Sequence, residues 1–322
     1  MRLLAVSLAC ACGLVLAQAQ APAPKQSTKN PQQRYRSKVC IYDLATKQIR
    51  IIHTADAVWE APNWTRDGKY LVSNSGGALY RIPVDGKGAP EKLAIPPELS
   101  CNNDHDFSRD GKWLAISASS PTARGSQVYI TNANGSNPRL VTTASPSYFH
   151  GWSPDGKWIS LVAQRNGSSF DLYRIPFGGG AEERLTSNPS YDDGPDHSPD
   201  GKWIYFNSDR GGGWNIWRIP AEGAGPDDTK AERVTNDNWE DWFPHPSPNS
   251  KWLVFLSFPP GTAGHGGRMQ IQLRMIPMPG KTIKLTPIQT VTKIFGGQGT
   301  LNVNSWSPDS KRFGFVEYEE IR

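Results

Sequence analysis

The chain has 322 residues, of which 37% are hydrophobic and 20% are charged, and this balance excludes a disordered polyelectrolyte. Its mean hydropathy of −0.54 excludes a polytopic membrane protein. The formal net charge is only +5 and the sequence contains no run of Lys or Arg, so nothing indicates nucleic-acid binding.

The N-terminal residues have the pattern of a secretory signal peptide. An apolar run over residues 3–17 is about 15 residues long, which is short for a membrane span of about 20 residues. The sequence Ala-Gln-Ala at 17–19 provides the small residues of a cleavage site. We therefore expect removal of residues 1–19, no membrane span afterwards, and a periplasmic or secreted location. An uncleaved anchor is the alternative. The polar, Pro- and Gln-rich residues 20–37 are predicted to form a flexible leader.

Removal of the signal would leave two of the four cysteines, Cys40 and Cys101. Export places a protein in an oxidising environment, in which two cysteines are able to form a disulfide. Their wide separation in sequence is unlike a CxxC motif, so a disulfide and two free thiols both stay open.

One eight-residue pattern recurs along the rest of the chain. Its clearest copy is WSPDGKWI at Trp152–Ile159, and similar copies begin at Trp64 and Phe107. The fourth residue of each copy is used here as its anchor, and successive anchors are separated by 43, 45, 45, 49 and 60 residues. A period of this length indicates stacked structural units of one kind. The six anchors are Asp67, Asp110, Asp155, Asp200, Asn249 and Asp309.

Each unit is predicted to contain four short strands. Ser-Pro-Asp-Gly forms a tight turn between the first two strands, because Pro fixes its own φ and Gly accepts a positive φ. In one unit the second and third strands are predicted at 202–206 and 215–220. Four strands per period of 40–50 residues are typical of a propeller blade. We therefore predict an all-β fold, a six-bladed β-propeller with four-stranded antiparallel blades, over residues 38–322.

The two ends of the chain are predicted to complete one blade together. The last repeat stops near Val316, after its second strand, whereas residues 39–43 and 48–53 match the third and fourth strands of a unit. Pairing of the N-terminal strands with the C-terminal strands closes the ring and leaves no open sheet edge inside it.

The repeated WSPDGK motif, followed by strands that contain Ile-Tyr or Ile-Trp, resembles the propeller repeat of the TolB family. The resemblance covers residues 38–322 and is closest to stand-alone secreted propellers described as TolB-like or as biopolymer-transport proteins. It implies binding of an envelope protein or a glycan, with a role in envelope transport. The chain has no room for the α/β domain that precedes the propeller in TolB itself, so we expect that domain to be absent.

Residues at the start of the first strand of every blade converge on the axis of a propeller, so a site is expected there. Counting back five and seven positions from each anchor gives His, carboxylate and aromatic residues that differ from blade to blade. A repeat that was only structural would place similar residues in every blade. The candidate ligand-binding residues of this predicted funnel are Glu60, Asp104, His105, Tyr148, His150, Asp193, Trp242, His245, Gln298, Asn302 and Asn304.

Two interpretations of the funnel involve no metal. In the first, its polar residues hold water and satisfy the backbone of the loops. In the second, the funnel binds a carbohydrate. The rings that would stack on sugar faces are Tyr148, Trp239 and Trp242, and the groups that would bond the hydroxyls are Glu60, Asp193 and Asn302.

The third interpretation is a metal site. His105, His150 and His245, together with Asp104 or Gln298, are predicted to surround one divalent ion such as Mn, Zn or Fe. The lead hypothesis for function is a propeller that binds a protein or glycan ligand in its funnel. The alternative is a metal-assisted polysaccharide lyase or glycoside hydrolase, so whether the protein is an enzyme stays open. We expect a monomer.

The two longest intervals between anchors contain insertions, at Phe258–Arg268 and Lys281–Leu301. Both are expected on the face where the funnel opens, forming a one-sided pocket or lid. His197 replaces the Trp of other repeats and is predicted to be packed and hydrogen-bonded, whereas His53 and His265 are predicted to lie on the surface.

Overall fold

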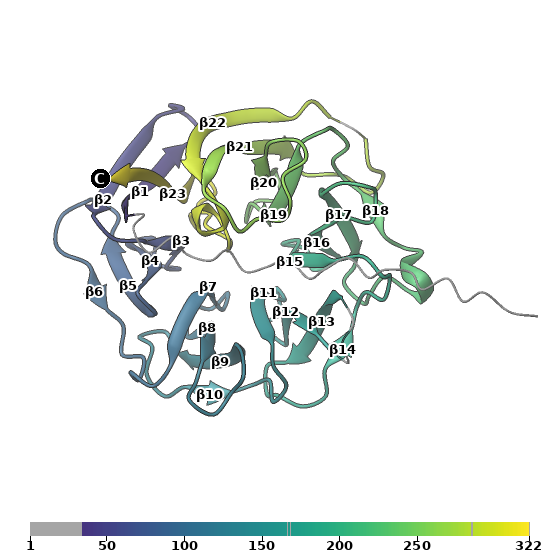
Figure 1. Ribbon diagram of the computed structural model, residues 1–322, viewed down its shortest axis with the longest axis horizontal. Coiled ribbons are helices and arrows are strands. Elements are labelled where there is room, and N and C mark those ends of the chain that lie inside the picture. Colours follow the sequence, from purple (N-terminus) through teal and green to yellow (C-terminus); the bar gives the residue numbers. More distant parts are fainter. Residues whose placement is uncertain (1–33, 166, 168, 285, 322) are drawn as a thin grey trace, which may run out of the picture.

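The computed structural model describes residues 34–165, 167, 169–284 and 286–321, and these form a closed ring of six sheets around a central axis (Figure 1). The predicted all-β, six-bladed propeller is therefore confirmed. The predicted signal peptide, 1–19, and residues 20–33 of the predicted leader lie outside the described residues. In the part of the chain that the structure describes, no helix has the length and apolar character needed to cross a membrane.

Blades one to five each contain four antiparallel strands that follow one another in sequence from the axis outward. Blade one contains β3 (Glu60–Trp64), β4 (Tyr70–Ser75), β5 (Ala78–Pro83) and β6 (Glu91–Lys92). Blade two contains β7 (Ser100–Phe107), β8 (Trp113–Ser119), β9 (Gln127–Asn132) and β10 (Arg139–Leu140). Blade three contains β11 (Ser147–Trp152), β12 (Trp158–Gln164), β13 (Phe170–Pro176) and β14 (Glu183–Arg184).

The fourth and fifth blades carry the two short 3-10 helices of the described residues. Blade four contains β15 (Asp192–His197), β16 (Trp203–Ser208), β17 (Asn215–Pro220), the helix η1 (Pro226–Asp228) and β18 (Glu232–Arg233). Blade five contains β19 (Glu240–Pro246), β20 (Trp252–Phe258), β21 (Met269–Pro277) and β22 (Gln289–Gly296), and η2 (Gln298–Thr300) follows it.

Blade six joins the two ends of the described chain. Its strands are β23 (Arg312–Ile321), β1 (Arg34–Asp43) and β2 (Ile49–Ala55), and a single bridge from Trp306 to Phe313 stands at the innermost position. β1 and β23 pair along their whole lengths, from Arg34 opposite Ile321 to Asp43 opposite Arg312. The predicted closure is therefore confirmed, although β1 begins at Arg34, inside the range expected for the leader.

The turn after each innermost strand explains why the sequence motif recurs. In all six copies a Ser or Thr hydroxyl donates a hydrogen bond of 2.6–2.8 Å to the anchor side chain. The same anchor oxygen accepts a bond from the backbone N–H two residues later, at 3.0–3.2 Å. Such Asx-type bonding stabilises a turn without help from other blades.

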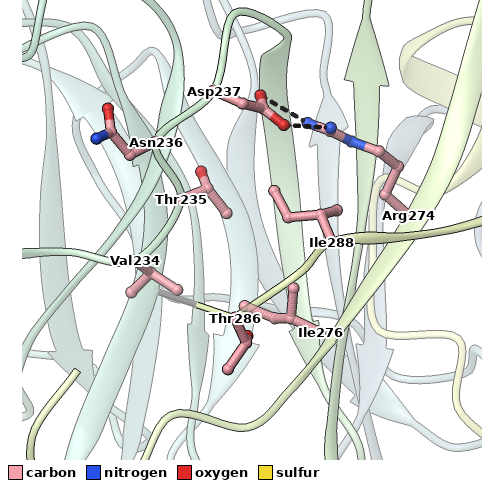
Figure 2. Close-up of a pocket in the computed structure, with 8 residues that line it drawn as sticks. All are labelled: Val234, Thr235, Asn236, Asp237, Arg274, Ile276, Thr286 and Ile288. Carbon is pink, nitrogen blue, oxygen red and sulfur yellow. Dashed lines mark hydrogen bonds and ion pairs between the residues drawn. The ribbon is translucent and has the colours of Figure 1, made fainter. Parts of the chain in front are cut away.

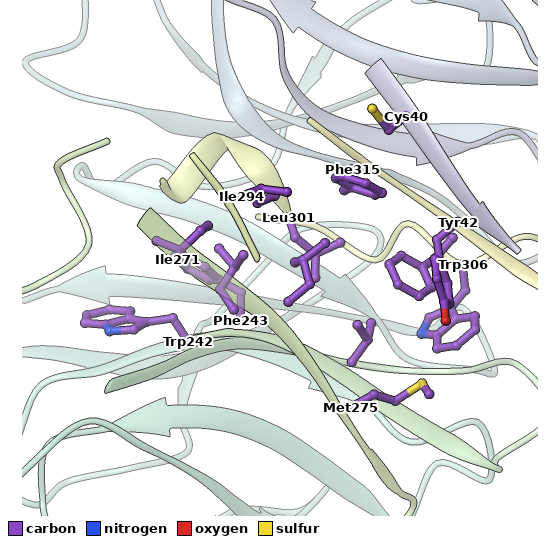
Figure 3. Close-up of a cluster of buried hydrophobic side chains, with 14 of the residues drawn as sticks. Cys40, Tyr42, Trp242, Phe243, Ile271, Met275, Ile294, Leu301, Trp306 and Phe315 are labelled. Atoms are coloured by element: carbon purple, nitrogen blue, oxygen red, sulfur yellow. The ribbon is translucent and has the colours of Figure 1, made fainter. Parts of the chain in front are cut away.

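The hydrophobic core is divided among the spaces between neighbouring blades. The largest cluster lies between blades five and six and joins Tyr42 and Phe315 to Trp242 and Ile271 (Figure 3). The same cluster contains Cys40, whereas Cys101 belongs to a cluster of blades one and two. Both cysteines are buried and free, which decides between the two alternatives in favour of free thiols.

Candidate functional site

A β-bulge interrupts the innermost strand of each of the first five blades. The pairing shifts between Glu60 and Asn63 in β3, and between Cys101 and His105 in β7. The other three shifts lie at Phe149/Gly151, Asp193/Asp196 and Trp242/His245. A bulge turns the side chains on either side of it in new directions, and here it divides the axial residues into two layers. We call them the loop-end layer, where these strands begin, and the turn-end layer, next to the anchor turns.

The turn-end layer is a polar network that joins several blades, in which Asn63 Oδ1 is the one buried atom of the named side chains left without a hydrogen bond in the described residues. Arg66 donates to Asp106 at 3.0 Å, and the Asn63 amide donates to the same carboxylate at 2.7 Å. On the other side of the axis, His245 Nδ1 lies 3.0 Å from Asp196 Oδ2, which also accepts a bond of 2.9 Å from Asn304. These contacts tie blades one, two, four, five and six together, so their role is structural.

Asp193 is the centre of the loop-end layer. Its carboxylate lies 3.1 Å from His150 Nε2 and 3.5 Å from His265 Nε2. Burial alone would raise the pKa of Asp193, but hydrogen bonds from the two histidines hold this pKa well below its usual range. Burial lowers the pKa of His150, and the nearby Asp193 and Asp104 outweigh burial, so the pKa of His150 is raised.

Asp104 lies in the same layer but has a different environment. Only 2% of the residue is exposed, and its carboxylate accepts hydrogen bonds from the amides of Asn102, at 2.6 Å, and Asn302. Both donors are neutral. Burial therefore raises the pKa of Asp104, although the charge of His150 acts against the change.

A row of aromatic rings borders the loop-end layer on blades three to five. Tyr148, Phe170 and Tyr191 are half-buried, and their neighbouring centroids are 6.2 and 5.1 Å apart. Trp214 continues the row, with its ring centroid 5.4 Å from that of Tyr191, and it packs on Trp242 with 3.8 Å between the centroids. The row places partly exposed rings beside buried carboxylates.

Trp242 is not available as a sugar-stacking platform, which corrects the carbohydrate interpretation at this residue. It is 1% exposed, because Trp214 covers it and His265 approaches to 4.4 Å between ring centroids. The Arg274 guanidinium lies over Trp239, another predicted stacking residue, with its carbon 5.5 Å from the centroid of the Trp239 ring.

The three histidines predicted as metal ligands have separate partners. His105 Nε2 lies 3.3 Å from the Val72 carbonyl, His150 contacts Asp193, and His245 contacts Asp196 and the Leu301 carbonyl. Residues 34–321, apart from the three undescribed positions among them, contain no group of three His, Cys, Asp or Glu side chains placed to hold a metal ion. The predicted three-histidine site is therefore not formed, because each bulge directs its histidine differently.

The loop 259–268, between β20 and β21, reaches from blade five over the axis. Its His265 contacts Asp193, and its Arg268 lies 3.2 Å from Glu60 of blade one. Near its start, Glu240 accepts a bond of 2.9 Å from the Gly261 N–H. His265 is thus part of the site and its side chain is only 18% exposed, so its predicted surface position was wrong.

The second insertion reaches the same end of the axis. Gly299, next to the half-buried Gln298 in η2, leaves no room for a Cβ, which would lie 2.6 Å from Glu60 Cγ and 2.7 Å from the Tyr318 hydroxyl. Both insertions therefore meet at Glu60, which confirms that they lie at one rim. The remaining two histidines lie elsewhere. His197 is buried and shares a 2.7 Å hydrogen bond with the Ser160 hydroxyl, as predicted. His53 is half-buried and packs against the ring of Trp59.

Two cavities lie between blades, away from the axis. One, of about 290 Å³, is lined by Asp237, Arg274, Ile276 and Ile288 among others (Figure 2). The guanidinium of Arg274 is already paired with Asp237 and Asp241. The second, of about 550 Å³, lies between blades one and two near Arg66 and Phe107. Neither contains a predicted funnel residue, so neither changes the location of the candidate site.

The closed ring, the repeated anchor turns and the asymmetric loop end define a six-bladed β-propeller with one differentiated axial face. A family model described as the TolB beta propeller domain matches residues 150–276. An uncharacterized protein of Agrobacterium fabrum is 40% identical over 288 residues, which cover 89% of this chain and 94% of that protein. The chain belongs to the TolB-like β-propeller family.

Solved structures agree with this assignment. A candidate TolB from Agrobacterium tumefaciens is 40% identical, with a TM-score of 0.82 over 89% of this chain and 99% of the other. TolB from Acinetobacter baumannii is 21% identical, with a TM-score of 0.57 over 76% of this chain and 61% of the other. The second similarity shows the fold alone.

Proposed function

We propose that this protein is exported to the periplasm or secreted, and that it binds a segment of another protein at the loop end of its axis. The observation that supports the proposal best is the aromatic row of Tyr148, Phe170, Tyr191 and Trp214, whose partly exposed rings border the buried Asp193. Aromatic rings with a hydrogen-bonding end are enriched at protein interfaces. A role in envelope transport follows from the family resemblance and is part of the proposal.

A protein ligand suits this surface better than a glycan. A sugar-binding platform needs an open ring face, and Trp242 is covered by Trp214. The rings that are partly exposed are tilted against one another, by 48° between Tyr148 and Phe170 and by 44° between Phe170 and Tyr191. Rings tilted in this way do not form one flat platform for a sugar face.

The test is binding of the purified mature protein to a synthetic random hexapeptide library and, in parallel, to a glycan array. We expect peptide binding that Tyr191→Ala weakens about tenfold, since large rings contribute most of the energy of such interfaces. Trp113→Ala is the matched control, because Trp113 is a 37% exposed ring next to the turn end. Binding to glycans alone, no binding to either, or equal loss in both variants contradicts the proposal.

A further inference from the structure

We infer that the segment bound at the loop end presents a cation to Asp104, either a Lys or Arg side chain or a free N-terminal ammonium. This inference rests on the proposed function and names the chemistry of its ligand. It is carried by the contrast between Asp104 and the other buried carboxylates around the axis.

Those other carboxylates each have a basic partner within the protein. Asp106 is paired with Arg66 at 3.0 Å, Asp193 with His150 at 3.1 Å, and Asp196 with His245 at 3.0 Å. In the described ranges, no Lys, Arg or His side chain forms an ion pair with Asp104, and its carboxylate accepts hydrogen bonds from the neutral amides of Asn102 and Asn302. His150 acts on Asp104 only from a distance, and a buried carboxylate with no cation in contact is costly, which makes Asp104 the place where an incoming cation gains most.

A second, independent feature lies beside Asp104. Asn302 is fully buried and donates its amide N–H to Asp104, while its carbonyl oxygen Oδ1 has no hydrogen-bond partner within the described part of the chain. The site therefore combines a carboxylate with an unused acceptor. An ammonium has three N–H donors and a guanidinium has five, so either group is able to satisfy both acceptors at once.

The neighbouring rings favour the same chemistry. Burial raises the pKa of both Tyr148 and Tyr191, and the charges of Asp104 and Asp193 add to the increase, so both phenols lie near these carboxylates. A cation gains further stabilisation over the face of a tyrosine ring. A divalent metal ion prefers several carboxylate or carbonyl oxygens, and the described residues offer no group of three acidic or imidazole ligands.

The experiment divides the hexapeptide library into four sub-libraries: with or without Lys and Arg, and with free or acetylated N-termini. The wild-type protein is expected to bind the sub-library that keeps both kinds of cation, and to bind the acetylated, Lys- and Arg-free sub-library at least about tenfold more weakly. The two intermediate sub-libraries show whether a side chain or the N-terminus supplies the cation. Equal binding of the acetylated, Lys- and Arg-free sub-library overturns the inference and leaves protein binding standing. Binding of no sub-library overturns the proposed function itself.

Asp104→Asn provides the second measurement, since it removes the charge and keeps the shape. We expect this variant to lose the preference for cationic sub-libraries while its melting temperature stays equal or rises, because a buried charge with no cation in contact is removed. A preference for cations that survives in Asp104→Asn contradicts the inference. A calcium-dependent rise in melting temperature that occurs in the wild type and not in Asp104→Asn also contradicts it, because it assigns the carboxylate to a metal ion.

Discussion

Ser250 and Ser310 show how single residues depart from the repeat. The first four anchor turns have Gly after the anchor, with φ of 70–72°, whereas Ser250 and Ser310 adopt φ of 58° and 59° at the equivalent positions. A residue with a Cβ is strained in this left-handed region, and glycine is not. The last two turns are therefore the strained copies of the motif.

Ser250→Gly is expected to raise the melting temperature by about 1–3 °C. The gain from relieved backbone strain exceeds the extra entropy that glycine gives the unfolded chain. Calorimetry of the purified variant checks the prediction.

Ser310→Gly is the matched comparison, because the Ser310 hydroxyl accepts a 3.0 Å bond from the Asn249 N–H of the neighbouring blade. The melting temperature of Ser310→Gly should rise less than that of Ser250→Gly, since Ser310→Gly also loses this hydrogen bond. A lower melting temperature for Ser250→Gly would show that this turn is not strained.

His197 makes stability depend on pH. Burial lowers its pKa from 6.5 to about 4, with Asp196 acting against the shift. The unfolded chain therefore binds a proton that the folded chain does not, so stability is complete above pH 6.5 and is lost as the pH falls toward 4. A shift of this size corresponds to about 3 kcal/mol in the free energy of unfolding.

Replacement of His197 by Phe should reduce the loss of stability between these two pH values, whatever its effect on stability at neutral pH. The measurement is urea unfolding of both proteins across the pH range. Part of the dependence should survive in the variant, because burial also lowers the pKa of His105 to about 4. Parallel curves for the two proteins would rule out His197 as a source.

At the scale of elements, two side chains of the loop 259–268 make its contacts near the axis. His265 touches Asp193 and the rings of Trp242 and Phe243, and Arg268 touches Glu60 and lies over the rings of Tyr35 and Tyr318. The loop contains Gly261, Gly264, Gly266 and Gly267, which make ordering it costly in conformational entropy. We expect it to open locally more easily than the strands that it joins.

His265→Ala should increase hydrogen exchange of amides in 259–268 about tenfold, because both the contact with Asp193 and the ring contacts are lost. His265→Phe keeps the ring contacts and should give an intermediate rate. Lys251→Ala, on the anchor turn of the same blade, serves as the control. Equal exchange in wild type and His265→Ala would mean that other contacts hold the loop.

The elements were predictable from the sequence and the axial geometry was not. The anchor turns depend on residues within one turn, such as Ser153 and Asp155, so a short motif predicts them. Spacing from the anchors predicts which side chains meet only if the innermost strands are straight and have equal register. The bulges differ in length, however, so His105 and His150, five residues before their anchors, reach different partners.

His265 and Trp242 show the second reason for error. The sequence correctly placed the insertion that contains His265 at the rim of the funnel, but the path of a loop across the axis depends on contacts with other blades. Likewise, Trp242 is buried because Trp214, from the neighbouring blade, covers it. A pattern within one repeat carries no information about such contacts between blades.

At the scale of the whole molecule, the ring depends on blade six. Its β1 strand pairs with β23 and contributes Val39 and Ile41 to the cluster shared with blade one, while Cys40 and Tyr42 enter the cluster shared with blade five. The ten residues of β1 thus bury surface against both neighbouring blades, one and five. Loss of this strand would expose two clusters and two sheet edges at once.

Deletion of residues 38–53 is expected to lower the melting temperature by more than about 10 °C or to prevent folding. Differential scanning calorimetry of the purified variant, or its recovery in the soluble fraction, gives the answer. An unchanged melting temperature would show that the remaining five blades hold the ring without the N-terminal strands.

The antiparallel pairing of β1 with β23 also determines how the molecule responds to a mechanical load. Arg34 lies opposite Ile321, so the two ends of the described chain are neighbours at the same end of one ladder. A pull on both ends loads the hydrogen bonds one after another, as in opening a zipper, whereas a shearing pull would load all of them together. Under tension between Arg34 and Ile321, blade six is therefore the first blade to open.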